Sequence, residues 1–203
     1  MRSKYVKSIL IGTLASIAFT TNAYAFAVQP DGYVDQSFVE AANDQLDLLP
    51  DYLIDAMEDD GLNIYITDKN IDSYFFGGYY GSVMGVTNTD GNGHTDIYIE
   101  DREKAVSDAT IHEVGHWLDV YCGNVTSTGE FSQIYNAESN AFCNAFLVNF
   151  HYDVREFYAE GFWKYFTDPD ILQENCPQLY ATIDSNLAGI CLLYTSPSPR
   201  DPK

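Results

Sequence analysis

The chain has 203 residues, of which 30 are Asp or Glu and only 10 are Lys or Arg, so its formal net charge is −20 at neutral pH. A charge this negative repels phosphate backbones and anionic membrane surfaces, which excludes nucleic acid as a partner class. It would attract basic peptides, although an acidic surface more often serves solubility alone.

The N-terminus has the three parts of a secretory signal peptide. Basic residues at Arg2, Lys4 and Lys7 precede an apolar core over residues 9–19, and Ala23 and Ala25 on either side of residue 24 have the pattern of a cleavage site. The apolar core is too short to span a bilayer. We therefore expect residues 1–25 to be removed and the mature protein to be secreted, without a membrane anchor and as a monomer.

The mature region, residues 26–190, contains five basic and 29 acidic residues and so has a formal charge of −24. Its length suits one domain with its own core, and no repeat or linker divides it. Apolar spacing predicts a helix over 35–49, and Pro50 starts a second helix that ends near Gly61. Alternating polar and apolar residues predict a strand over 62–67.

The next segments have the character of a sheet and its turns. An aromatic, glycine-rich stretch over residues 74–85 is expected to form a turn and part of the sheet edge. Residues 88–94 place side-chain oxygens at alternate positions, like a calcium loop. However, Ile99 stands where the bidentate glutamate is needed, so we predict a hairpin turn instead. Residues 95–100 alternate as a half-buried strand.

The run His112-Glu113-Val114-Gly115-His116 has the pattern of a catalytic zinc site. On a helix the two histidines lie one turn apart on one face and can hold one metal ion. Glu113 can then act as general base on a water whose pKa zinc lowers to about 7. N-cap residues over 107–110 and the apolar spacing that follows predict the helix. This context favours a peptidase over a structural helix with two surface histidines.

A catalytic zinc needs a third protein ligand further along the chain. One class of zinc peptidases continues the motif as HExxHxxGxxH. Here Asp119 and Cys122 occupy the last two of those positions, which excludes that class. A glutamate on a later helix is the other common option, and the candidates are Glu130, Glu138, Glu156 and Glu160.

The candidates differ in their surroundings. Residues 156–166 are aromatic on nearly every face of a helix, so we expect this helix to be buried and its carboxylates to need a partner. Glu156 and Glu160 share one face, as a zinc ligand and a carboxylate that hydrogen-bonds to a ligand histidine would. Glu138, in a predicted apolar helix over 136–150, has more polar neighbours and is the second choice.

Two motifs together resemble the catalytic domain of anthrax lethal factor and its relatives, which include secreted Pro-Pro endopeptidases. That family combines HExGHxxDxYxG with a later E[FY][FY]AExF, and residues 112–123 and 156–162 carry both at a similar separation. The similarity covers about residues 50–190. It implies an α+β, zincin-like fold of the gluzincin type, with a small mixed sheet, the HExxH helix and a second helix that bears a glutamate ligand.

Carried over position by position, the resemblance implies functional residues. It makes His112, His116 and Glu156 the ligands of Zn²⁺ and Glu113 the general base. Glu160 matches a family glutamate that is expected to support the site by contacting a zinc ligand rather than the zinc ion. These assignments imply an endopeptidase that acts on peptide or protein substrates.

The tyrosine that stabilises the oxyanion in this family has no direct counterpart. It stands seven residues before the glutamate ligand, where this chain has Asn149. Because a neutral phenol can donate a hydrogen bond to the developing charge, we predict Tyr152 as the donor, with His151 as the alternative. Tyr152 could equally be an aromatic that packs beneath the helix.

The sequence therefore predicts a secreted zinc endopeptidase and leaves one alternative. A catalytically inactive exported protein, such as a toxin-like or zinc-stabilised binding domain, is favoured by the missing tyrosine. The intact HExxH favours the enzyme, because its glutamate is not needed for metal binding alone.

The cysteines and the C-terminal segment carry two further expectations. Cys122, Cys143 and Cys176 make one disulfide plausible in an exported protein, with the pairing open. Residues 191–203 resemble the translation of a sequencing-library adaptor, so we expect them to be foreign to the fold. A genuine Pro-rich tail is the alternative.

Overall fold

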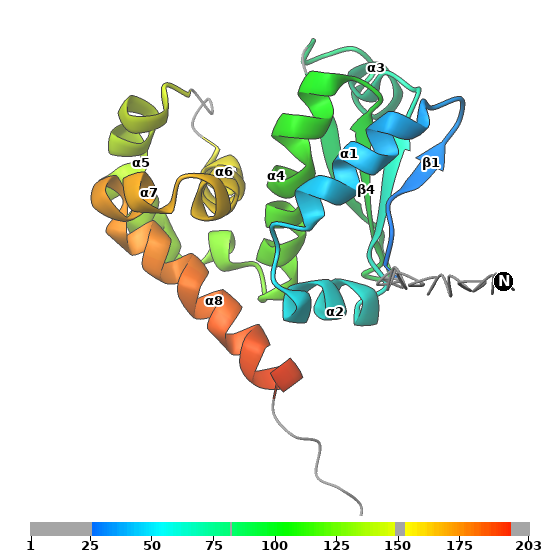
Figure 1. Cartoon of the computed structure of the whole chain (residues 1–203). Helices are drawn as coiled ribbons and strands as arrows, with labels where there is room; N and C mark the ends of the chain where they lie inside the picture. The colour runs from blue at the N-terminus through cyan, green and yellow to red at the C-terminus, as the bar shows by residue number, and fades with distance from the viewer. Residues whose placement is uncertain (1–25, 82, 149–152, 196–203) are drawn as a thin grey trace, which may run out of the picture.

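The computed structural model of the chain describes residues 26–81, 83–148 and 153–195 (Figure 1). The predicted signal peptide lies outside these residues. The elements are β1 (Gln29–Asp31), α1 (Gln36–Leu46), α2 (Asp51–Asp59), β2 (Asn63–Thr67), α3 (Ile71–Phe76), β3 (Gly85–Thr89), β4 (Thr95–Glu100), α4 (Glu103–Tyr121), a 3-10 turn η1 (Val125–Ser127), α5 (Gly129–Phe146), α6 (Val154–Thr167), α7 (Pro169–Asn175) and α8 (Pro177–Thr195).

The strands form a small mixed sheet in the order β1-β2-β4-β3. β1, β2 and β4 are parallel, whereas β3 pairs antiparallel with β4 and forms one edge. The predicted hairpin joins β3 and β4, and its turn is held by the Asp90 carboxylate, which accepts hydrogen bonds from the main-chain N–H groups of Asn92 and His94. The predicted strands over 62–67 and 95–100 are confirmed as β2 and β4.

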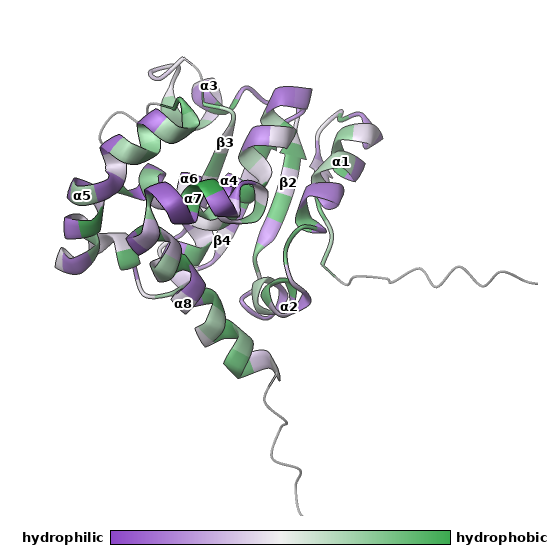
Figure 2. Ribbon diagram, turned by 60° about the vertical axis from the view of Figure 1, so that its left-hand side comes forward, coloured by the Kyte–Doolittle hydropathy of each residue, from purple (hydrophilic) through white to green (hydrophobic). Residues whose placement is uncertain are grey.

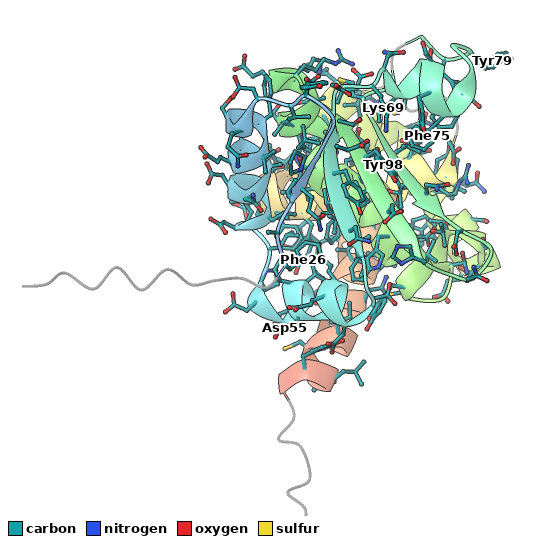
Figure 3. The ribbon with its side chains drawn as sticks, turned by 90° about the vertical axis from the view of Figure 1, so that its right-hand side faces the viewer. Phe26, Asp55, Lys69, Phe75, Tyr79 and Tyr98 are labelled. Atoms are coloured by element: carbon teal, nitrogen blue, oxygen red, sulfur yellow. The ribbon has the colours of Figure 1, made fainter. Side chains whose placement is uncertain are left out.

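The two faces of the sheet differ. Ile64, Ile66, Ile97 and Ile99 are fully buried under the helices, while the alternate residues of β2 and β4 point to the other face. There Tyr65 and Tyr98 stack with their ring centroids 5.1 Å apart, and Phe75 and Lys69 lie beside them (Figure 3). The helices that pack directly on the buried face include α4, which contacts both β3 and β4.

The first helices follow the sequence pattern closely. α1 begins after Asp35, whose side chain caps it by accepting from the Ser37 N–H, and α2 follows the predicted Pro50. The predicted start of α4 among residues 107–110 is wrong, because the helix begins at Glu103. Buried Ala105 and Val106 extend its apolar face by one turn, and alanine is the strongest helix former.

The second half of the chain is helical and lies on the other side of α4 from the sheet (Figure 1). α5 begins at Gly129, earlier than predicted, because Thr128 caps it by accepting from the Phe131 N–H. α8 is strongly apolar toward its C-terminus (Figure 2) and packs on α2 through that half. It runs through residues 191–195 without a break, into the segment predicted to be foreign, and residues 196–203 lie outside the described part.

None of the four cysteines, all of which lie in the described residues, forms a disulfide, so that expectation is wrong. Cys176 is buried, and its sulfur faces the main-chain carbonyl of Glu138 at 3.7 Å. Burial raises the pKa of the Cys122 thiol to about 11, which makes it unreactive. Within the described residues, no helix has the length and apolar character needed to cross a membrane.

Helices α4 and α6 approach closely at Gly115. A Cβ atom built there would lie 2.9 Å from the Ala159 Cα and 3.1 Å from the Phe162 Cβ. Both distances are too short for carbon atoms, and the first involves backbone that cannot turn aside. The contact therefore requires glycine for lack of space rather than for backbone conformation.

Gly115→Ala should lower the free energy of unfolding by roughly 1–2 kcal/mol. Overpacking costs about 1–3 kcal/mol, and the better helix propensity of alanine offsets up to about 1 kcal/mol. Gly189→Ala in α8 is the matched control, since nothing lies within 4 Å of its Cβ position. Chemical denaturation with a chelator present measures both. Equal stabilisation by the two substitutions would show that α4 and α6 are not in tight contact.

Candidate active site

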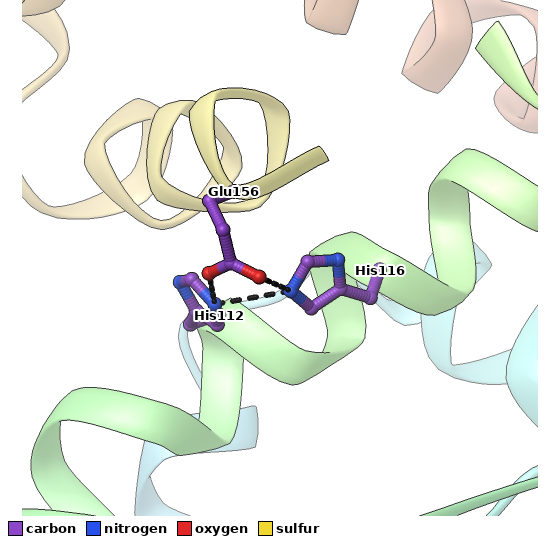
Figure 4. A group of neighbouring side chains, drawn as sticks. All are labelled: His112, His116 and Glu156. Atoms are coloured by element: carbon purple, nitrogen blue, oxygen red, sulfur yellow. Dashed lines mark hydrogen bonds and ion pairs between the residues drawn. The ribbon is translucent and has the colours of Figure 1, made fainter. Parts of the chain in front are cut away.

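Helix α4 brings the two motif histidines together on the face that it turns toward α6 (Figure 4). Their Nε2 atoms lie 3.2 Å apart, and the rings meet edge to face. His112 is only 9% exposed, and His116 is half-buried. Both rings therefore direct a nitrogen to one point at the rim of the helix interface.

Glu156 reaches the same point from α6. Asp153 caps this helix by accepting from the Arg155 N–H, which places Glu156 in the first turn, where the helix dipole favours a carboxylate. Its Oε2 lies 3.2 Å from His112 Nε2, and its Oε1 lies 3.3 Å from His116 Nε2. Figure 4 shows the carboxylate directed from α6 at both rings.

These three side chains fit a zinc ion. One ligand atom from each lies within 4.8 Å of the others, and among the described residues this is the group of His, Cys, Asp and Glu side chains that could hold a metal ion. Ligands bound about 2.0–2.1 Å from a tetrahedral zinc ion lie about 3.3–3.4 Å from one another. The two Nε2 atoms, 3.2 Å apart, are close to that spacing, and each lies 3.2–3.3 Å from a different oxygen of the Glu156 carboxylate.

The electrostatics of the group favour positive charge. Burial alone would lower the pKa of His112, but its hydrogen bond with Glu156 and the charges of Glu113 and Glu160 outweigh burial and raise it to about 9. Burial would raise the pKa of Glu156, yet its hydrogen bonds to both histidines lower it well below the usual range. A metal ion that binds here would displace protons, because only neutral imidazole is a ligand.

Glu160 lies behind His112, one helical turn after Glu156. Its Oε1 is 3.5 Å from His112 Nδ1, the ring nitrogen that faces away from Glu156. Burial raises the pKa of Glu160, and its Oε2 is buried without a hydrogen-bond partner among the described residues. Ligand histidines usually donate their second N–H to a carboxylate, and Glu160 is placed for that contact.

Glu113, the residue after His112 on α4, directs its carboxylate toward the edge strand β3, and its charge also acts on His112. Its side chain is 6% exposed, and the Thr87 hydroxyl lies 2.8 Å from its Oε2. Thr87 is absent from the residues predicted from sequence. The sequence signal for this contact is weak, because it is a single threonine in a short segment. That segment is recognisable as a strand only from its pairing with β4 in the structure.

The other candidate glutamates are accounted for elsewhere. Glu138 is 5% exposed, and its carboxylate accepts hydrogen bonds from the main-chain N–H groups of Gln178 and Leu179, so it caps α8. Glu130 is exposed at the start of α5. The burial argument for the third ligand is only partly right, because the Glu156 side chain is 42% exposed. A catalytic metal needs an open side for its substrate, which a fully buried ligand set would deny.

The residues predicted to bind the oxyanion directly precede α6 in the sequence. Tyr152, its alternative His151, and Asn149 at the family position all lie outside the described residues. They directly precede Asp153, the cap of α6. Their position in the chain is therefore adjacent to the helix that bears Glu156.

Two comparisons relate the chain to known proteins. A family model described as "Anthrax toxin lethal factor, N- and C-terminal domain" matches residues 80–186, more than half of the chain. The solved structure of the Pro-Pro endopeptidase PPEP-2 from Paenibacillus alvei has a TM-score of 0.59 and 20% sequence identity, over 80% of this chain and 97% of that one. No curated protein matches in sequence. The α+β, zincin-like fold implied by the resemblance is therefore confirmed.

Glu156→Gln should weaken zinc binding by more than about 100-fold. Even residues that only hydrogen-bond to the ligands contribute about 10–100-fold to metal affinity in such sites. Competition with a fluorescent chelator measures the affinity. Glu130→Gln is the control, since this exposed glutamate should leave the affinity unchanged. An unaltered affinity in Glu156→Gln would remove this residue from the ligand set.

Glu138→Ala should lower the free energy of unfolding by about 2–4 kcal/mol, because it leaves one buried and one partly buried main-chain donor of α8 without this acceptor. Zinc affinity should stay within about twofold of wild type in the folded protein, as expected of a cap rather than a ligand. Denaturation curves and the chelator competition give both quantities. Glu40→Ala, at an exposed position of α1, is the control. A large loss of zinc affinity without a loss of stability would contradict the capping role.

Proposed function

The chain belongs to the anthrax toxin lethal factor family of zinc metallopeptidases, and on that premise we propose that it is a zinc-dependent endopeptidase. The observation that carries the proposal is the convergence of His112, His116 and Glu156 at one point. Glu113 stands next to the first ligand on the same helix, as hydrolysis requires and metal binding alone does not.

We assign the zinc ion to His112, His116 and Glu156. When bound, it would polarise the scissile carbonyl and acidify the attacking water. Glu113 accepts the proton of that water as general base and afterwards delivers it to the leaving amine as general acid. Its burial keeps bulk water away from the carboxylate that carries this proton.

Two further residues complete the proposed mechanism. Glu160 orients His112 through the Nδ1 atom, which leaves Nε2 of the same ring for the metal. Tyr152, or His151 in its place, donates a hydrogen bond to the oxyanion that forms on the substrate carbonyl. Both residues stand directly before α6 in the sequence.

The proposed substrates are peptides or proteins that reach the enzyme outside the cell. Export rests on the signal-peptide pattern over residues 1–25, and residues 26–190 form the proposed peptidase domain. The charge of −24 in that domain favours basic over acidic peptides. The solved relative is named a Pro-Pro endopeptidase, so peptides with a Pro-Pro bond belong among the first substrates to test.

A peptide library that includes Pro-Pro sequences tests the proposal. The purified protein should cleave at least one peptide, cleavage should stop when a chelator removes the metal, and added zinc should restore it. Mass spectrometry of the products gives the cleaved bond. If no peptide is cleaved with zinc present, the protein is an exported binding domain or an inactive relative rather than an enzyme.

Glu113→Gln should lower kcat by about 100-fold or more, because positioned general bases contribute about 10²–10⁴-fold. The substitution keeps the size of the side chain and removes its basicity, so zinc content should remain at one ion per chain. Initial rates and metal analysis check the two quantities. Glu103→Gln, in the exposed first turn of the same helix, is the control. Full activity in Glu113→Gln would exclude Glu113 as the base.

A further inference from the structure

Glu113 can serve as a base only if its carboxylate is held in one direction. A glutamate side chain has three rotatable bonds, and fixing them costs conformational entropy. The structure contains a specific restraint outside the family motif, on the edge strand β3. It consists of one hydroxyl group and one missing side chain.

The hydroxyl belongs to Thr87. Its Oγ1 lies 2.8 Å from Glu113 Oε2 and 2.9 Å from the main-chain oxygen of the same residue. A hydroxyl has one hydrogen to donate, and an ionised carboxylate is the stronger acceptor of the two. Thr87 therefore donates to Oε2 while Glu113 is ionised, and Oε1 is left for other contacts.

The direction of Thr87 follows from the sheet. In the β3–β4 hairpin Thr87 pairs with Ile97, whose side chain is fully buried on the helix side. Paired residues of neighbouring strands point to the same face, so the Thr87 side chain also points toward α4. The register of the hairpin thus aims the hydroxyl at Glu113, and a shift of one residue would turn it to the opposite face.

The missing side chain is that of Gly85, two residues earlier on the same face of β3. A Cβ atom at this position would lie 2.7 Å from Glu113 Oε1 and 2.8 Å from Glu113 Cγ. The backbone angle of Gly85 is one that other residues adopt, so glycine is not required there for conformation. Its role is to leave room for the carboxylate.

We propose that Thr87 is a positioning residue for the general base and that Gly85 provides the space in which this base lies. The inference deepens the proposed function and rests on it. Thr87 holds Oε2, so the proton taken from the attacking water resides on Oε1 and leaves from Oε1 to the amine. The edge strand thereby fixes which oxygen of Glu113 exchanges the proton.

Thr87→Val tests the inference, because valine has nearly the shape of threonine and keeps the strand preference without the hydroxyl. We expect kcat to fall about 10–100-fold, the range seen when a residue that hydrogen-bonds to a functional side chain and orients it is removed. KM and zinc affinity should stay within about twofold of wild type. Thr87→Ser keeps the hydroxyl and should restore most of kcat. In a Glu113→Gln background, Thr87→Val should cause no further loss, because the two residues act as one unit.

Gly85→Ala provides a second measurement on a separate residue. The added methyl group would meet the Glu113 side chain and, at 3.0 Å, the Cβ of Ala109. The Glu113 side chain can turn aside, so we expect the folded variant to bind zinc while its displaced base lowers kcat. A wild-type kcat in Thr87→Val, or an equal loss of kcat in Thr87→Ser and Thr87→Val, would overturn the inference. The proposed function would stand in either case, provided that the wild type shows chelator-sensitive cleavage. Absence of cleavage by the wild type would overturn both.

Discussion

The contact between α4 and α6 at Gly115 is the constraint on which the proposed metal site depends. His112 and His116 come from one helix and Glu156 from the other, so the ligand set exists only at the separation that the missing Cβ permits. Protein interiors are closely packed, with few voids. An added methyl group at this contact would therefore push the two helices apart. The glycine in the motif is therefore part of the site although it contacts no ligand atom.

The position of α6 is fixed in turn from its other side. Glu138 on α5 accepts from the N–H of Leu179 at the start of α8, and the side chain of Leu179 fills the space above Gly161 of α6. Two glycines thus let α6 approach both α4 and α8. A buried carboxylate sets where α8 begins, so residues far apart in the chain act together to place Glu156.

The sequence predicted the parts of the site that depend on spacing within one helix. His112 and His116 follow from the period of α4, and Glu156 and Glu160 follow from the period of α6. Asp119 belongs to the same motif. The sequence did not predict that it holds the turn after α4 by accepting from the N–H and hydroxyl of Thr126. Its role is local support rather than chemistry.

Other features depend on contacts between segments, which periodicity does not encode. Thr87 reaches Glu113 only through the register of the β3–β4 hairpin, and Glu138 caps α8 across 40 residues of chain. The exposure of Glu156 was missed for a related reason. Aromatic composition predicts how buried a helix is as a whole, but not that its first turn opens at the end of the interface.

The charges around the proposed metal site favour a cation. Glu113, Glu156 and Glu160 surround two imidazoles, and all but Glu156 among these carboxylates lie largely out of water. Without a metal ion, the raised pKa of His112 supplies positive charge in the form of a proton. Glu160 Oε2 is then buried without a hydrogen-bond partner in the part of the chain that the structure describes. A divalent ion would provide two charges at the point where three ligand atoms already meet. Protons and a metal ion would therefore compete for one position among these carboxylates.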